Sequence, residues 1–116
     1  MPHVNLTERL KIDEALSQVW FVHDYIQLQF QDKTVTVLNV PTLTIPDGRS
    51  IHRSDIGFCD ALVALIDQPL VSVSEDEEVA ITLRFGDGTC LAIPLHGKDA
   101  KGPEAMEVGP YIFFNA

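Results

Sequence analysis

The stretch LRFGDGTCLAIPL, residues 83–95, decides the fold because it predicts a β-hairpin. Apolar residues alternate on both sides of the Gly-Asp-Gly tripeptide at 86–88, as in two strands joined by a tight turn. A phosphate-binding glycine loop leads from a strand into a helix, whereas this tripeptide leads into a second strand. We therefore interpret the glycines as turn residues. A three-residue loop with Gly88 in the left-handed conformation places Leu83 opposite Leu91.

The same pattern occurs earlier in the chain. Residues 26–40 align with residues 81–95 at a constant offset of 55, which places Phe30 on Phe85. This repetition predicts an internal duplication of a three-stranded antiparallel unit. With further strands expected at 17–22 and 70–74, the two related units cover about residues 17–40 and 70–95.

The alignment also places Lys33 on Gly88. A left-handed conformation costs a residue other than glycine about 1–2 kcal/mol. If the two hairpins are equivalent, Lys33→Gly is therefore expected to raise the melting temperature.

An apolar stripe between the two units predicts a helix over about residues 54–67. Ser54 or Asp55 can cap its beginning, and Pro69 prevents its continuation. We expect the segment 41–50 to be a loop and the final YIFF to be a strand; the first sixteen residues are compatible with a short helix or a strand. The stripe repeats with a period of 3.6 residues and consists of Phe58, Ala61, Leu62, Leu65 and Ile66.

These elements predict an α+β fold that is mainly antiparallel, with two related β-units flanking one helix. The helix must bury its apolar stripe, and the sheet offers the face that it can cover. A duplication favours one curved or partly closed sheet. At 116 residues, the chain is expected to be a single domain, residues 1–116.

The charge of the chain narrows its partners. Seventeen acidic and eight basic residues give a formal net charge of −9. Such a surface repels nucleic acids and anionic membranes, so we expect neither as a partner. A basic protein is the favoured partner, and the acidic run formed by Glu75, Asp76, Glu77 and Glu78 is its candidate contact.

The sequence also indicates a compartment. Its beginning lacks the basic region and apolar stretch of a signal peptide. The longest apolar run, residues 61–66, is too short to span a membrane. Two cysteines make no secreted disulfide framework, and we therefore expect a cytoplasmic protein.

No motif in the sequence predicts catalysis. His23 and Asp24 are adjacent, and neighbours in a strand point to opposite faces, so a turn is the favoured interpretation. Cys59, on the helix, is expected to be a buried, inert thiol, and Cys90 has no histidine partner. Ser54 is a better cap than nucleophile. We expect no enzyme, no cofactor and no metal.

A basic cluster supports an alternative function. Arg49, His52 and Arg53 precede the expected helix, where arginines can bind a carboxylate or a phosphate. A small-ligand or anion-binding protein that uses the 47–53 loop, together with Glu104, is therefore the alternative to an interaction protein.

Two strands predict a second subunit. In VWFV (19–22) and YIFF (111–114) both faces are apolar, which is typical of strands covered on both sides. A chain with one helix has little of its own to cover them. We therefore expect a homodimer that pairs through strand edges or sheet faces.

The second unit resembles a family of small uncharacterised bacterial proteins with the pattern L-x-F-x-D-G-x-x-L-x-(V/I)-P and a later E-A pair. The resemblance covers about residues 16–115 and implies two β-rich halves around a short helix. A tryptophan often follows the pair in that family, where this chain has Met106. Some members are suspected immunity or accessory proteins of bacterial toxin systems, which implies a non-catalytic interaction role. The matching residues are Leu83, Phe85, Asp87, Gly88, Leu91, Ile93, Pro94, Glu104 and Ala105.

Overall fold

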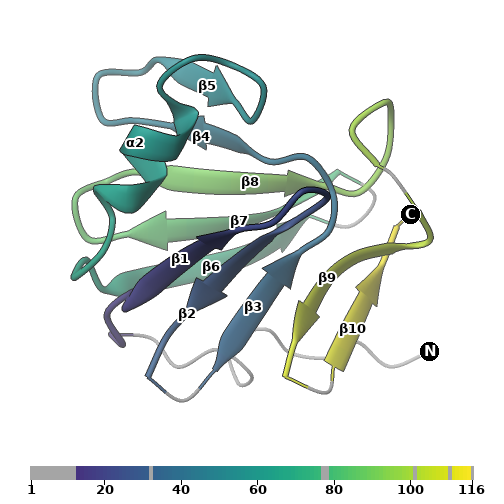
Figure 1. Ribbon diagram of the computed structural model, residues 1–116, viewed down its shortest axis with the longest axis horizontal. Coiled ribbons are helices and arrows are strands. Elements are labelled where there is room, and N and C mark those ends of the chain that lie inside the picture. The colour runs from purple at the N-terminus through teal and green to yellow at the C-terminus, as the bar shows by residue number, and fades with distance from the viewer. Residues whose placement is uncertain (1–12, 32, 77–78, 101, 110, 116) are drawn as a thin grey trace.

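In the computed structural model, the described residues form two five-stranded antiparallel sheets and one short helix (Figure 1). The structure describes residues 13–31, 33–76, 79–100, 102–109 and 111–115. The first sheet has the order β1 (Gln18–Phe21), β2 (Ile26–Gln29), β3 (Thr34–Val37), β9 (Glu104–Val108), β10 (Tyr111–Phe114). The second has the order β5 (Ser50–His52), β4 (Thr42–Thr44), β8 (Cys90–Pro94), β7 (Ala80–Phe85), β6 (Leu70–Asp76).

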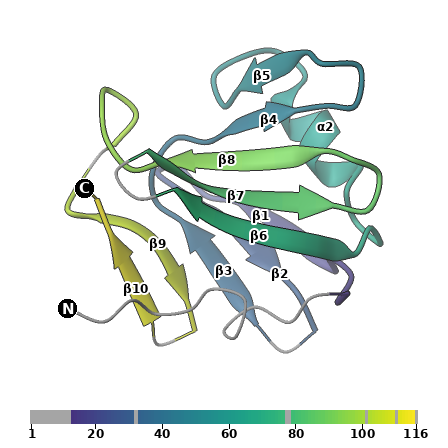
Figure 2. The same cartoon turned by 180° about the vertical axis from the view of Figure 1, so that it is seen from behind.

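The two sheets lie face to face as two layers, so the expected single curved sheet is wrong (Figure 2). Antiparallel pairing is confirmed throughout, and the fold is mainly β. Each predicted three-stranded unit lies in its own sheet, as β1-β2-β3 and β6-β7-β8. The chain then exchanges sheets, because β4 and β5 join the second unit whereas β9 and β10 join the first. This exchange prevents a single continuous sheet.

One apolar core fills the space between the layers. Alternate residues of β2, β7 and β8 are buried, as the period of two predicts for strands with one covered face. The rings of Phe30 and Phe85, which the offset of 55 relates, stack across the layers with centroids 6.4 Å apart. The two hairpins therefore pack against each other in the core between the sheets.

The β7–β8 turn is the predicted three-residue loop. Leu83 pairs with Leu91, the Phe85 N–H donates to the Thr89 carbonyl at 2.9 Å, and Gly88 has a φ of 95°. A Cβ atom on Gly86 would lie 2.9 Å from the ring of Pro69. One glycine is therefore required by its backbone conformation, and the other by a close approach.

The β2–β3 hairpin is built differently. The Phe30 N–H donates to the Lys33 carbonyl at 2.8 Å, so Lys33 occupies the position of Thr89 and not that of Gly88. The first hairpin is one residue shorter than the second. The expectation that Lys33→Gly raises the melting temperature is therefore unfounded, because it placed Lys33 at the left-handed position.

We predict that Gly88→Ala lowers the free energy of unfolding by about 1–2 kcal/mol, because a Cβ atom strains a residue at positive φ. Lys33→Gly should not stabilise the protein, since glycine gains conformational entropy in the unfolded chain. Urea unfolding of both variants checks this difference. A more stable Lys33→Gly variant would show that the two turns are equivalent after all.

The helix α2 (Phe58–Val63) is shorter than the predicted 54–67. Its N-cap is Gly57, and neither Ser54 nor Asp55 caps it with a side chain. The Asp55 carboxylate accepts the His52 N–H at 2.8 Å instead, and tight turns follow the helix. The predicted stripe is nevertheless confirmed as part of the core, where α2 fills the space beside β1 and β4.

The expected loop 41–50 is in fact the β4–β5 hairpin. Its tip repeats the β7–β8 turn: the Ile45 N–H donates to the Arg49 carbonyl at 3.0 Å, and Gly48 has a φ of 95°. Each turn has an aspartate that accepts the N–H two residues later, at 2.9 Å for Asp47. The shared Asp-Gly sequence was the signal for this second hairpin. The strand β9 was also not predicted.

Residues 13–16, which precede β1, pair with the beginning of β6. Ala15 bridges Pro69, and Leu16 is fully buried as part of the apolar core. The Leu70 N–H donates to the Glu14 carbonyl at 3.0 Å, so this segment covers the beginning of β6. Residues 13–16 are neither the helix nor the strand considered for the beginning of the chain; residues 1–12 lie outside the described residues.

Candidate functional site

The chain passes between the two sheets at one end of the sandwich. Residues 38–41 lead from β3 to β4, and residues 95–103 lead from β8 to β9. Asn39 joins the two crossings: it is buried, and its Nδ2 donates to the Pro94 carbonyl at 2.6 Å and to the Asn115 Oδ1 at 2.5 Å. We call this end of the molecule the crossover end.

A cavity of about 290 Å³ opens at the crossover end, and it contains two of the three residues of the predicted anion site. His52 and Arg53 line it, together with Tyr25. Arg49 does not, because it lies at the β4–β5 turn and pairs with Asp47 at 2.8 Å. The backbone N–H of Arg49 donates a hydrogen bond to the Asp47 carboxylate, and the Arg49 guanidinium donates a second one; both lower the pKa of Asp47. We call this space the crossover cavity.

His52 holds together two segments that border the crossover cavity. Its Nδ1 lies 3.2 Å from the Ser54 amide and 2.7 Å from the Ser54 Oγ, while its Nε2 lies 3.1 Å from the Asp99 Oδ1. An amide N–H only donates, so we assign the proton to Nε2, which donates to Asp99. Ser54, His52 and Asp99 are therefore arranged in the order of a catalytic triad. The Nδ1 lone pair of His52 already accepts the Ser54 amide N–H, however, and is not free to accept a proton from the Ser54 hydroxyl. The arrangement closes a turn and holds the 95–100 loop against β5.

Arg53 is held by aromatic rings. Its guanidinium carbon lies 5.5 Å from the ring centroid of Phe21 and 5.8 Å from that of Phe58, within the range of cation–π contacts. It donates one weak hydrogen bond, to the Cys59 Sγ at 3.8 Å. In the described part of the chain it forms no ion pair. The rings therefore fix a cation whose charge is not neutralised.

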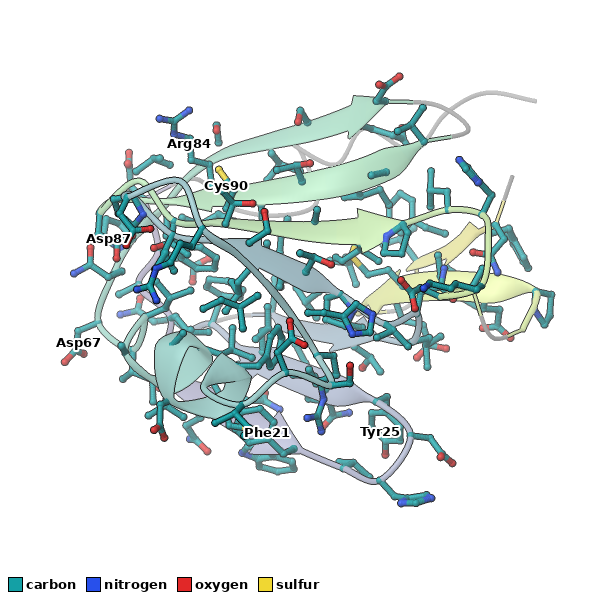
Figure 3. The ribbon with its side chains drawn as sticks, turned by 90° about the horizontal axis from the view of Figure 1, so that it is seen from above. Phe21, Tyr25, Asp67, Arg84, Asp87 and Cys90 are labelled. Atoms are coloured by element: carbon teal, nitrogen blue, oxygen red, sulfur yellow. The ribbon has the colours of Figure 1, made fainter. Side chains whose placement is uncertain are left out.

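A second cavity of about 450 Å³ adjoins the first and shares Asp24 and Tyr25 with it (Figure 3 labels Tyr25). Glu104 and Glu107 line this second cavity. Glu104 does not line the crossover cavity, although the sequence placed it with the 47–53 loop. His23, whose Nε2 lies 3.5 Å from Asp24, is exposed in the turn that the sequence predicted. The two cavities thus differ in charge.

An apolar surface lies where β1 meets α2, which are neighbours (Figure 1). Trp20 is 51% and Phe21 37% exposed on β1, and Ile56 and Val63 are exposed beside and on α2. Cys59, one helical turn before Val63, is a free thiol and exposed, so the expectation of a buried thiol is wrong. We call these five residues the β1–α2 surface.

The described half of the acidic run, Glu75 and Asp76, lies in a strand. Glu75 and Asp76 belong to β6 and not to a loop, and they pair with Ile81 and Ala80. Successive residues of a strand point to opposite faces, so the two carboxylates diverge. Glu77 and Glu78 lie outside the described residues. The contact with a basic partner at this run stays a prediction.

No family model, curated protein or solved structure matches the chain. The resemblance to the bacterial family therefore stays a prediction. Among the described residues, no three histidine, cysteine or acidic side chains gather as a metal site. Over the same residues, no helix has the length and apolar character that crossing a membrane requires.

Proposed function

We propose that this protein is a non-catalytic interaction domain whose first partner is a second copy of itself, bound through the β1–α2 surface. The observation that carries the proposal is the exposure of Trp20 and Phe21 on an edge strand. Large aromatic side chains are enriched in protein interfaces and depleted on free surfaces. A strand that is apolar on both faces, as the sequence showed, gains a cover from a second copy.

The backbone of β1 supports edge pairing. Val22 and Tyr25 exchange two hydrogen bonds, at 2.9 and 3.4 Å. Hydrogen-bonded and non-bonded pairs alternate in an antiparallel ladder, so the backbone groups of Val19 and Phe21 face away from β2. These groups form an open edge that another strand can join.

The other edges of the two sheets are less suited to a second copy. β6 has a register shift near Val71, carries Glu75 and Asp76, and is covered at its beginning by residues 13–16. β5 has only three residues. β10 lies beside Glu104 and Glu107 of β9. β1 consists of Gln18–Phe21 and carries no charge.

The charge of the chain also favours β1 as the edge at which two copies pair. Each copy has a net charge of −9, so two copies repel each other over most of their surface. At β1, and at Gln27 and Gln29 of the neighbouring β2, no carboxylates are brought together. An uncharged apolar edge is therefore the place where two such acidic molecules meet at the lowest electrostatic cost.

We predict that Trp20→Lys weakens the dimer at least tenfold, because it places like charges at the edge and removes the largest apolar side chain. The indole makes one hydrogen bond within the chain, to the Gln18 Oε1 at 2.9 Å, so the monomer should remain folded. Sedimentation equilibrium measures the dissociation constant. The matched control is Val71→Lys, which places the same charge on the β6 edge, where an unchanged constant is expected.

Fluorescence offers an independent measurement, since Trp20 is the only tryptophan of the chain. Its emission should shift to shorter wavelength as concentration increases, because dimer formation removes the indole from water. Emission that does not depend on concentration, in a sample that forms dimers, would place the interface elsewhere.

A non-catalytic interaction domain can also bind a protein other than a second copy of itself. A basic protein is the second candidate, and the exposed Glu75 and Asp76 at the end of β6 favour it. An accessory or immunity-like role in a bacterium is what the sequence resemblance supports. A cytoplasmic location is supported by two free cysteines, which suit a reducing compartment.

A further inference from the structure

We propose that the crossover cavity is a binding site for the carboxylate of a small monoanionic organic acid, with Arg53 as its receptor. Two arginines of the same segment, Arg49 and Arg53, differ in their partners. Arg49 is neutralised by Asp47 at 2.8 Å, whereas Arg53 has no carboxylate partner in the described part of the chain. In a chain with 17 acidic and 8 basic residues, partners are abundant, and an unpaired half-buried guanidinium stands out.

Arg53 is positioned before any ligand arrives. Contacts with the rings of Phe21 and Phe58 restrict the guanidinium, and among the described residues one acceptor, the Cys59 sulfur, receives a hydrogen bond from it. A guanidinium presents its N–H groups as a planar fork that fits a carboxylate with two parallel hydrogen bonds. A restricted fork loses less entropy when it binds.

The cavity itself selects the ligand. Its volume of about 290 Å³ is near the lower limit of small-molecule sites, roughly 300 Å³. Ile26, Val37 and Val40 supply apolar lining, and Tyr25 supplies an aromatic side with a hydroxyl group. These features suit a short organic acid with an apolar part.

Charge favours one negative charge over two. Asp24 lines the cavity, and Asp99 lies behind His52 at 3.1 Å. Among the described lining residues Arg53 is the one permanent cation, since the two histidines of the lining already face carboxylates: His23 lies 3.5 Å from Asp24 and His52 lies 3.1 Å from Asp99. A phosphate dianion would meet these two carboxylates with a single guanidinium to balance it. A monocarboxylate is balanced by Arg53 alone.

The test uses sodium propionate as the probe, with propionamide as its neutral analogue, inorganic phosphate as the rival anion and sodium chloride to match ionic strength. Titration is followed by the ¹⁵N resonances of the full chain, including the arginine Nε signals. Saturable shifts at Arg53 and Tyr25 are expected with propionate and not with propionamide. Phosphate that binds more tightly than propionate would overturn the monocarboxylate assignment.

Arg53→Gln should weaken propionate binding at least tenfold, and Arg49→Gln, the matched control, should leave it unchanged. Arg53→Lys keeps the charge without the planar fork and should give an intermediate affinity, which decides the matter if the glutamine variant does not fold. Equal binding by wild type and the Arg53 variants would overturn the site. The Trp20→Lys monomer retains Arg53, so loss of dimer formation and absence of acid binding are separate results.

Discussion

Phe85→Ala is expected to lower the free energy of unfolding by about 3–5 kcal/mol, the usual cost of deleting a buried phenylalanine. The Phe85 side chain is fully buried and stacks on the ring of Phe30 from the opposite sheet. Its removal leaves a void at the point where the two layers meet. Because Phe85 also begins the β7–β8 turn, the void cannot close without moving that turn.

Phe114→Ala is the matched control for this variant. Phe114 is 63% exposed on β10, so the same truncation there should change the free energy of unfolding by less than about 0.5 kcal/mol. Urea unfolding of both variants gives the comparison. Equal losses at the two positions would contradict the packing of the two sheets around the Phe30–Phe85 pair.

Asn39→Leu is expected to lower the free energy of unfolding by about 1–3 kcal/mol, because two part-buried acceptors lose their donor. The Asn39 amide donates to the Pro94 carbonyl at 2.6 Å and to Asn115 at 2.5 Å, and thereby joins β3, β8 and the end of β10. Leucine has a similar volume, so the loss reports hydrogen bonds and not a cavity.

Asn115→Ala tests one of the hydrogen bonds of Asn39 separately. It removes the Oδ1 acceptor and an exposed hydrogen bond from the Asn115 amide to the Gly102 carbonyl, and it leaves the bond from Asn39 to Pro94. The loss should therefore be smaller than that of Asn39→Leu. Thermal unfolding of the two variants decides this order. If Asn115→Ala were the more damaging variant, Asn39 would not be the centre of the crossover end.

Local patterns in the sequence were sufficient for the units and not for their assembly. The alternation around Gly88 predicted the β7–β8 register, because a strand with one buried face repeats every two residues. The exchange of β4–β5 and β9–β10 between sheets depends on contacts between distant segments. A single sequence contains no periodic signal for such contacts.

The helix shows why the ends of an element were harder to predict than its buried face. Phe58 and Leu62 were placed correctly in the core, since a period of 3.6 residues identifies a buried face. Its length was overestimated because Asp55 accepts a hydrogen bond from His52 instead of capping a longer helix. Competition between two local hydrogen bonds is decided by the surrounding structure.

The candidate site was predicted in part. His52 and Arg53 were singled out for their charge, and both line the crossover cavity, whereas Arg49 faces away because a turn aspartate two residues before it is a closer partner. Asp99, Tyr25 and Asn39 were missed. They come from three other segments, and nothing in the spacing of these residues connects them to His52.

Native mass spectrometry of the wild-type chain tests the central proposal most directly, because it counts copies and reveals bound molecules in one spectrum. We expect a dimer at micromolar concentration that dissociates in Trp20→Lys and persists in Val71→Lys. A chain that is monomeric at every concentration up to the millimolar range would contradict the proposed interaction through the β1–α2 surface.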